Sequence, residues 1–151
     1  MMEAMKRLSN LLWFASALLA ISIWTRTAMA APVQLNIKVI YAHSKSKLID
    51  PKLKDLAKQF SKLKFTAYEL KDEGSYTLDI GASGSLQLPG GEWMKVIAKE
   101  MTPEGMLRLD LVVDKPRFRS TAIIAAGATL AVSGPKQESG SLILAVTRPK
   151  N

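Results

Sequence analysis

Short runs of alternating apolar and polar residues, separated by glycine and proline turns, make up the chain from residue 65 onward. Alternation with a period of two is typical of strands that bury one face. It predicts strands at 65–70, 75–80, 84–88, 92–101, 106–114, 118–125, 128–133 and 141–147. Glycine and proline favour tight reversals, and they predict turns at 71–74, 81–84, 89–91, 102–105, 115–116, 126–127 and 134–140. This spacing indicates an antiparallel meander, sandwich or partial barrel.

The earlier part of the chain adds one strand and one helix. Residues 33–41 alternate strictly, which predicts a half-buried strand. Asp50 and Pro51 are typical of a helix start, because the carboxylate accepts from free N–H groups and proline is tolerated at the first helical position. The apolar stripe of this helix consists of Leu53, Leu56, Ala57, Phe60 and Leu63. The order predicts an α+β fold, with one amphipathic helix packed on a mainly antiparallel β meander or sandwich.

The first 30 residues contain the three parts of an export signal. Lys6 and Arg7 precede an apolar run at 11–24, and Ala28 and Ala30 have the A-x-A spacing of a cleavage site. The alternative is an uncleaved membrane anchor, but a run of 14 residues is shorter than the roughly 20 that cross a bilayer as a helix. We expect a cleavable signal peptide at 1–30 and a single domain at 31–151. This domain is expected to be periplasmic or extracellular and to have no transmembrane anchor.

Positive charge is concentrated in one part of the predicted domain. Eight lysines and two aspartates lie from residue 38 to residue 64, whereas residues 65–151 contain ten basic and ten acidic side chains. Clustered positive charge attracts anionic partners. The sequence therefore predicts an anion- or partner-binding surface made of Lys45, Lys47, Lys54, Lys58 and Lys62. The alternative is a solvated lysine face that binds nothing.

The expected partners follow from this charge and from the predicted compartment. An envelope protein with an acidic patch, anionic lipid head groups and an acidic wall polymer all complement the lysines. Nucleic acid is not expected, because the compartment disfavours it and no strand has the arginine and aromatic residues typical of RNA-binding sheets.

The sequence predicts no catalytic residue, cofactor or metal site. The chain has no cysteine, which excludes thiolate chemistry. It has a single histidine, His43, so only one imidazole could act as a general base. A Ser–His–acid arrangement using His43, or a pair of Ser44 or Ser46 with Lys47, is the alternative hydrolase site. Trp93 follows a Gly-Gly turn and is expected in the core or at the sheet rim.

Several β segments resemble known proteins. The chain resembles a set of small exported bacterial proteins of undescribed function in three segments, Leu88-Pro-Gly-Gly91, Gly127–Pro135 and Gly140–Val146. Residues 120–134, with the final apolar strand, are similar to strand pairs of secretin-type outer-membrane gates, although the chain lacks the repeated ring-building domains of secretins. This similarity implies an envelope-assembly context and assigns no functional residue.

Charge, compartment and resemblance together predict a non-catalytic protein. We expect an accessory or adaptor subunit of an envelope assembly, which contacts its partner through sheet edges or the lysine-rich helix. The alternative is a binding module for anionic lipid head groups or acidic polymer. A hydrolase that depends on His43 is the least favoured hypothesis.

Overall fold

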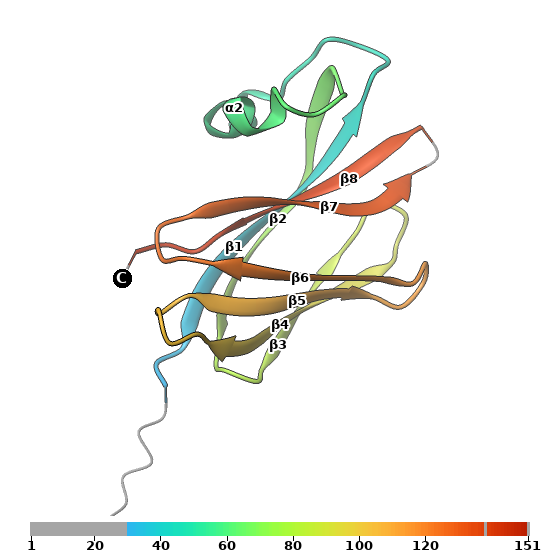
Figure 1. The fold of residues 1–151 in the computed structure, drawn as a ribbon. Coiled ribbons are helices and arrows are strands. Elements are labelled where there is room, and N and C mark those ends of the chain that lie inside the picture. The colour runs from blue at the N-terminus through green and yellow to red at the C-terminus, as the bar shows by residue number, and fades with distance from the viewer. Residues whose placement is uncertain (1–29, 138, 151) are drawn as a thin grey trace, which may run out of the picture.

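The computed structural model describes residues 30–137 and 139–150. Its helical elements are a 3-10 helix, η1 (Pro51–Leu56), and a short α-helix, α2 (Ala57–Phe60). The strands are β1 (Val33–His43), β2 (Ala67–Leu78), β3 (Ser83–Gln87), β4 (Trp93–Met101), β5 (Leu107–Val113), β6 (Phe118–Ile124), β7 (Thr129–Gln137) and β8 (Gly140–Thr147). The prediction of a β-rich α+β fold is confirmed (Figure 1). The predicted signal peptide, apart from Ala30, lies outside the described residues.

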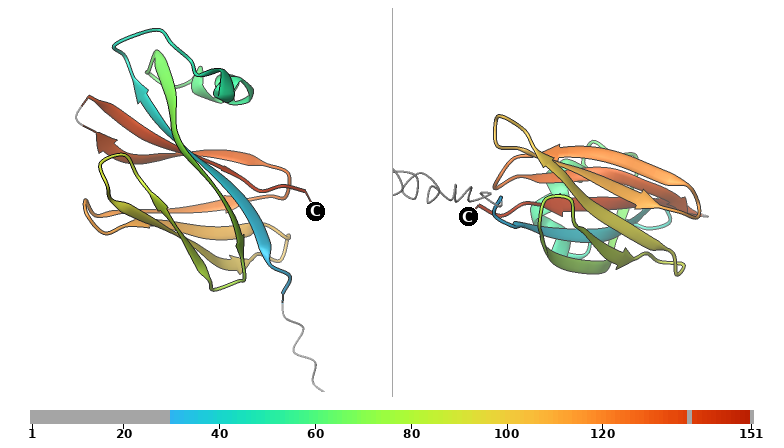
Figure 2. Two further views of the ribbon diagram at one scale, coloured as in Figure 1. Left: turned by 180° about the vertical axis from the view of Figure 1, so that it is seen from behind. Right: turned by 90° about the horizontal axis from the view of Figure 1, so that it is seen from below.

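The strands form two four-stranded antiparallel sheets. The first sheet has the order β2-β1-β8-β7, and the second has the order β3-β4-β5-β6. In the second sheet, each strand pairs with the strand that follows it in the sequence. The first sheet instead pairs β1 with β8. The sheets lie as two layers, with the helical segment beyond the first sheet (Figures 1 and 2).

Two hydrophobic clusters lie on opposite faces of the first sheet. The larger cluster is shared by both sheets and includes the fully buried Ile37, Val96, Leu109 and Leu144. The smaller cluster joins the outer face of the first sheet to the helical segment, residues 51–60. Its members are Ile40, Ala42, Leu53, Leu56, Phe60, Tyr68, Ile143 and Ala145. The central strands β1 and β8 supply both clusters, so they bury both faces where the helical segment covers them.

The helical segment begins as a 3-10 helix rather than as the α-helix that the apolar stripe predicts. Asp50 caps it, because its Oδ1 accepts the backbone N–H of Lys52 at 2.9 Å. A 3-10 helix has three residues per turn, so residues i and i+3 lie on the same side. Leu53 and Leu56 therefore both face the sheet and are buried.

The segment also ends earlier than the apolar stripe predicts. α2 ends at Phe60, and the Ser61 hydroxyl donates to the carbonyl of Lys58 at 2.7 Å. Such side-chain bonds to the backbone compete with further helical turns. Leu63 lies beyond the helix and is 37% exposed, so its predicted place in the buried stripe is wrong.

Two predicted turns are parts of strands. Residues 71–74 lie inside β2, which pairs with β1 along its whole length through a register shift at Val39–Ile40. Of the turn predicted at 134–140, residues 134–137 lie inside β7, where the register against β8 shifts at Ser133–Lys136. Both shifts are β-bulges, which absorb an irregular residue without ending the strand and accept proline at a sheet edge.

The Gly-Gly turn between β3 and β4 exposes an aromatic side chain. Gly90 and Gly91 have φ angles of 105° and 94°, a conformation that favours glycine. Trp93 follows them at the start of β4 and is 59% exposed, so it lies outside the core.

Among the residues that the structure describes, no helix combines the length and the apolar character needed to cross a bilayer.

Candidate functional site

A groove lies between the end of the helical segment and strand β7. Its volume is about 550 Å³. It is lined by Lys58, Gln59, Lys62, Leu63, Leu130, Ala131, Val132, Ser133 and Ile143. We call this feature the β7 groove. Its lining is mostly apolar, and both of its charged residues come from α2 and the turn that follows it.

Aromatic packing fixes the end of α2 that carries the two lysines. The rings of Phe60 and Tyr68 stack with centroids 4.4 Å apart and an interplanar angle of 7°. The Tyr68 hydroxyl donates to the carbonyls of Phe60 and Phe65 at 3.1 and 3.2 Å. Burial raises the pKa of Tyr68, and the hydrogen bond to Phe65 acts in the opposite direction. The neutral hydroxyl therefore holds the chain on both sides of the turn at residues 61–64 against β2.

Gln59 connects α2 directly to the edge of the sheet. Its Nε2 donates to the carbonyl of Thr129 at 3.4 Å. β7 is the last strand in the order of the first sheet, and this carbonyl belongs to its first residue. The contact therefore lies beside the groove and fixes the distance between its helix side and its strand side.

The composition of the β7 groove determines what it can bind. When a ligand covers apolar side chains such as Leu63 and Ala131, each Å² of apolar surface removed from water favours binding by about 25 cal/mol. The ammonium groups of Lys58 and Lys62 attract anions, while their aliphatic stems can extend the apolar surface. The groove therefore suits a ligand in which apolar and acidic groups occur together.

The structure brings together two of the five lysines that the sequence predicts as binding residues. Lys58 and Lys62 both line the β7 groove. Lys54 is exposed on η1, and Lys45 and Lys47 are exposed in the loop after β1, but none of these three lines the groove. Lys54 lies on η1, Lys58 lies on α2 and Lys62 follows the end of α2, so the three lysines do not lie on one continuous helix.

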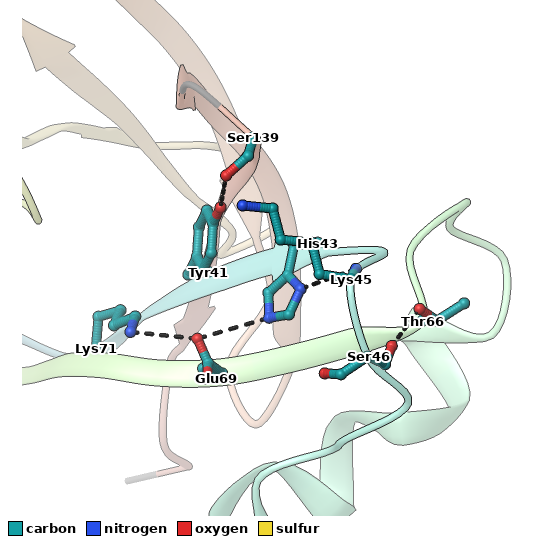
Figure 3. Close-up of polar contacts among 8 residues, drawn as sticks. All are labelled: Tyr41, His43, Lys45, Ser46, Thr66, Glu69, Lys71 and Ser139. Atoms are coloured by element: carbon teal, nitrogen blue, oxygen red, sulfur yellow. Dashed lines mark hydrogen bonds and ion pairs between the residues drawn. The ribbon is translucent and has the colours of Figure 1, made fainter.

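His43 belongs to a polar cluster at the end of β1 (Figure 3). Its ring is buried, its Nδ1 accepts the backbone N–H of Lys45 at 3.2 Å, and its Nε2 lies 3.7 Å from Glu69 Oε2. Glu69 also pairs with Lys71, whose Nζ lies 3.2 Å from the same oxygen. One ring nitrogen of His43 therefore binds the loop that follows β1, and the other faces Glu69 of β2.

Two serines near His43 have hydrogen-bond partners other than the imidazole. Ser44 Oγ donates to the carbonyl of Lys64 at 3.5 Å, and Ser139 Oγ lies 2.8 Å from the Tyr41 hydroxyl. Within the described part of the chain, no hydrogen bond joins His43 to a serine hydroxyl. These same residues contain no group of three or more His, Cys, Asp or Glu side chains arranged to hold a metal ion. The cluster ties the end of β1 to β2 and to the following loop.

The sequence does not predict the apolar floor of the β7 groove, which consists of Leu63, Leu130, Ala131, Val132 and Ile143. The helical periodicity places Leu63 in the buried stripe, and the alternation at 128–133 indicates only one more strand. The one signal in the sequence is that residues 128–133 are uncharged on both faces, which is unusual for an open sheet edge.

Comparisons with known proteins identify no relative of this chain. It matches no protein-family model, no curated protein and no solved structure. Its function is therefore inferred from the groove, from the charge of the lysines and from the sequence of the N-terminal segment.

Proposed function

We propose that the protein is a non-catalytic accessory or adaptor subunit of a cell-envelope assembly and that it binds its partner through the β7 groove. The observation that carries this proposal is the position of Lys58 and Lys62 beside a mostly apolar groove of about 550 Å³. Protein interfaces likewise combine an apolar centre with a polar rim. The export signal predicted at 1–30 supports a location in the periplasm or outside the cell.

In this proposal the two sheets form a sandwich that serves as a rigid scaffold. The larger hydrophobic cluster is shared between the sheets and contains none of the helical residues. The groove instead lies on the outer face of the first sheet, where the helical segment is held by the smaller cluster. A preformed site of this kind binds with a smaller loss of conformational entropy than a site that must be ordered by its ligand.

The test is recovery of the protein from its own cells after crosslinking and gentle solubilisation. We expect the tagged protein to be recovered in a complex with envelope proteins. The charge-reversing variant Lys58→Glu/Lys62→Glu is expected to lower this recovery. Lys95→Glu/Lys99→Glu is the matched control, because these exposed lysines lie on β4 of the other sheet. Recovery as a free monomer in every crosslinking condition would refute the proposal.

The alternative function is binding of anionic lipid head groups or acidic polymer. The exposure of Lys45, Lys47 and Lys54 outside the groove favours it, because a flat charged surface is recognised through several lysines at once. It predicts binding to phosphatidylglycerol vesicles that weakens with salt, as expected for screened charges. Lys54→Glu/Lys58→Glu/Lys62→Glu would remove this binding, and absence of vesicle binding at low salt would exclude the alternative.

A further inference from the structure

We infer that the β7 groove binds an extended peptide segment that adds to the first sheet as a strand next to β7. The segment carries alternating apolar residues and acidic residues that reach Lys58 and Lys62. This inference rests on the proposed adaptor function and names the chemistry of the partner. Strand addition at a sheet edge is a common mode of peptide recognition, in which backbone hydrogen bonds give affinity and side-chain pockets give specificity.

Strand β7 presents an open edge along the groove. In the described residues, β7 pairs with β8 and with no other strand. Arg148 N–H donates to the carbonyl of Ala128, so this carbonyl points toward β8, whereas Gln59 approaches the carbonyl of Thr129 from the helix side. Backbone groups alternate in direction along a strand. The N–H and carbonyl groups of Thr129, Ala131 and Ser133 therefore point away from β8.

Residues 129–133 lack the backbone and side-chain features that normally protect a sheet edge. Charged side chains, proline and bulges discourage pairing with another chain. The opposite edge of the sheet, β2, has a bulge and the exposed residues 71–73, which are all charged. β7 itself has Pro135, Lys136 and a bulge after residue 133. The uncharged residues 130–133 are thus left open where the groove lies, whereas the outward carbonyl of Thr129 already accepts from Gln59.

Charge and geometry favour an acidic peptide over other occupants. A second copy paired through β7 would bring two Lys58 and two Lys62 side chains together. Residues 1–29 of the chain contain three basic residues and one acidic residue, so they do not complement the lysines either. A lipid acyl chain in the groove would cover the outward backbone groups of Ala131 without hydrogen-bonding them, which is costly.

The test uses NMR on the mature protein and a synthetic seven-residue peptide with alternating Val and Thr and a Glu at each end. We expect shifts and slowed hydrogen exchange at the amides of Thr129, Ala131 and Ser133. N-methylation of alternate peptide residues on the pairing side should abolish binding, while N-methylation on the opposite side should not. Because this change is in the ligand, the protein remains folded in both arms. Equal binding of both methylated peptides would overturn strand addition.

Variants of the protein test the two parts of the site separately. Ala131→Pro removes an N–H that faces away from β8, so it should abolish peptide binding while the β8 pairing remains. Lys58→Glu/Lys62→Glu should weaken binding by about tenfold, as two exposed ion pairs suggest. The control Lys95→Glu/Lys99→Glu should bind normally. A peptide with Lys in place of Glu should bind weakly, and equal affinity for both peptides would contradict the acidic preference.

Further arms distinguish the other occupants and the adaptor function itself. Binding of phosphatidylglycerol vesicles at this groove without peptide binding, or dimerisation through β7, would replace the inference. If the crosslinked envelope complex is recovered with Ala131→Pro as fully as with the wild-type protein, the adaptor proposal stands and strand addition fails. If the peptide binds as expected but no complex is recovered, strand addition stands and the adaptor proposal fails.

Discussion

Truncation of Phe60 to alanine is expected to detach the helical segment while both sheets remain folded. Phe60 is 2% exposed, stacks on Tyr68 and belongs to the smaller hydrophobic cluster. Replacing a buried phenylalanine by alanine costs about 3–5 kcal/mol, which includes the lost stacking. The larger cluster between the sheets contains none of the atoms removed. The loss therefore falls on the interface between the helical segment and the first sheet.

Native-state hydrogen exchange measures this local effect residue by residue. A loss of about 3–5 kcal/mol corresponds to faster exchange of the helical amides by roughly 150- to 5,000-fold. The amides of β5 should keep their protection. Leu111→Ala is the matched control, because Leu111 is fully buried in the larger cluster and its loss should reduce protection in strands of both sheets.

The same experiment contains the result that would refute the reasoning. If Phe60→Ala lowers protection in β5 as much as in the helical segment, the two clusters form one cooperative unit. Positioning of Lys58 and Lys62 would then not be separable from folding of the sheets. If the helical amides are unchanged, the stacking of Phe60 on Tyr68 contributes little to holding the segment.

Three further predictions concern the helix cap at Asp50, the close packing of Gly140 on Ala42 and the ionisation of Tyr68. Asp50→Ala removes the acceptor at the start of η1 and should cost about 1 kcal/mol, seen as roughly fivefold faster exchange of the helical amides; Asp55→Ala, in the same segment, should leave exchange unchanged. Gly140→Ala should lower the free energy of unfolding by about 1–3 kcal/mol in urea denaturation, because the new Cβ would overlap the backbone carbonyl of Ala42; an unchanged urea midpoint would contradict the packing of β8 on β1. Burial raises the pKa of Tyr68, so the native state binds this proton more tightly and the free energy of unfolding should fall as pH rises above about 10; Tyr68→Phe should show a smaller fall, and identical pH profiles would argue against the raised pKa.

Local sequence patterns predict most of the secondary structure because most strands alternate between buried and exposed side chains. Residues 33–41 alternate, and the structure places Leu35, Ile37 and Val39 in the core between the sheets. The predictions failed where a partner strand decides the outcome. Residues 71–74 have the composition of a turn, but pairing with β1 through a bulge keeps them in a strand. Ser61 ends the helix through one backbone contact that helical periodicity does not report.

The candidate site was predicted only in its charged part. Lysine clusters are visible in the sequence, so Lys58 and Lys62 were among the predicted residues. The apolar floor depends on which strand lies at the sheet edge beside the helical segment, and this is set by pairing between residues far apart in the chain. Gln59 and Thr129 illustrate the point, because 70 residues separate the two ends of their contact.

The pairing of the first strand with the last strand has a consequence for the order of folding. Residues 36–43 pair with residues 140–147, so the first sheet contains contacts between the two ends of the domain, and such non-local contacts form slowly. The second sheet needs only residues 83–124, which are joined by consecutive hairpins. A chain in which residues 140–147 are not yet paired can therefore assemble the second sheet but leaves β1 without β8. The β7 groove forms only when β8 has paired with β1 and β7, because Ile143 of β8 lines it, so binding at this edge requires the complete first sheet.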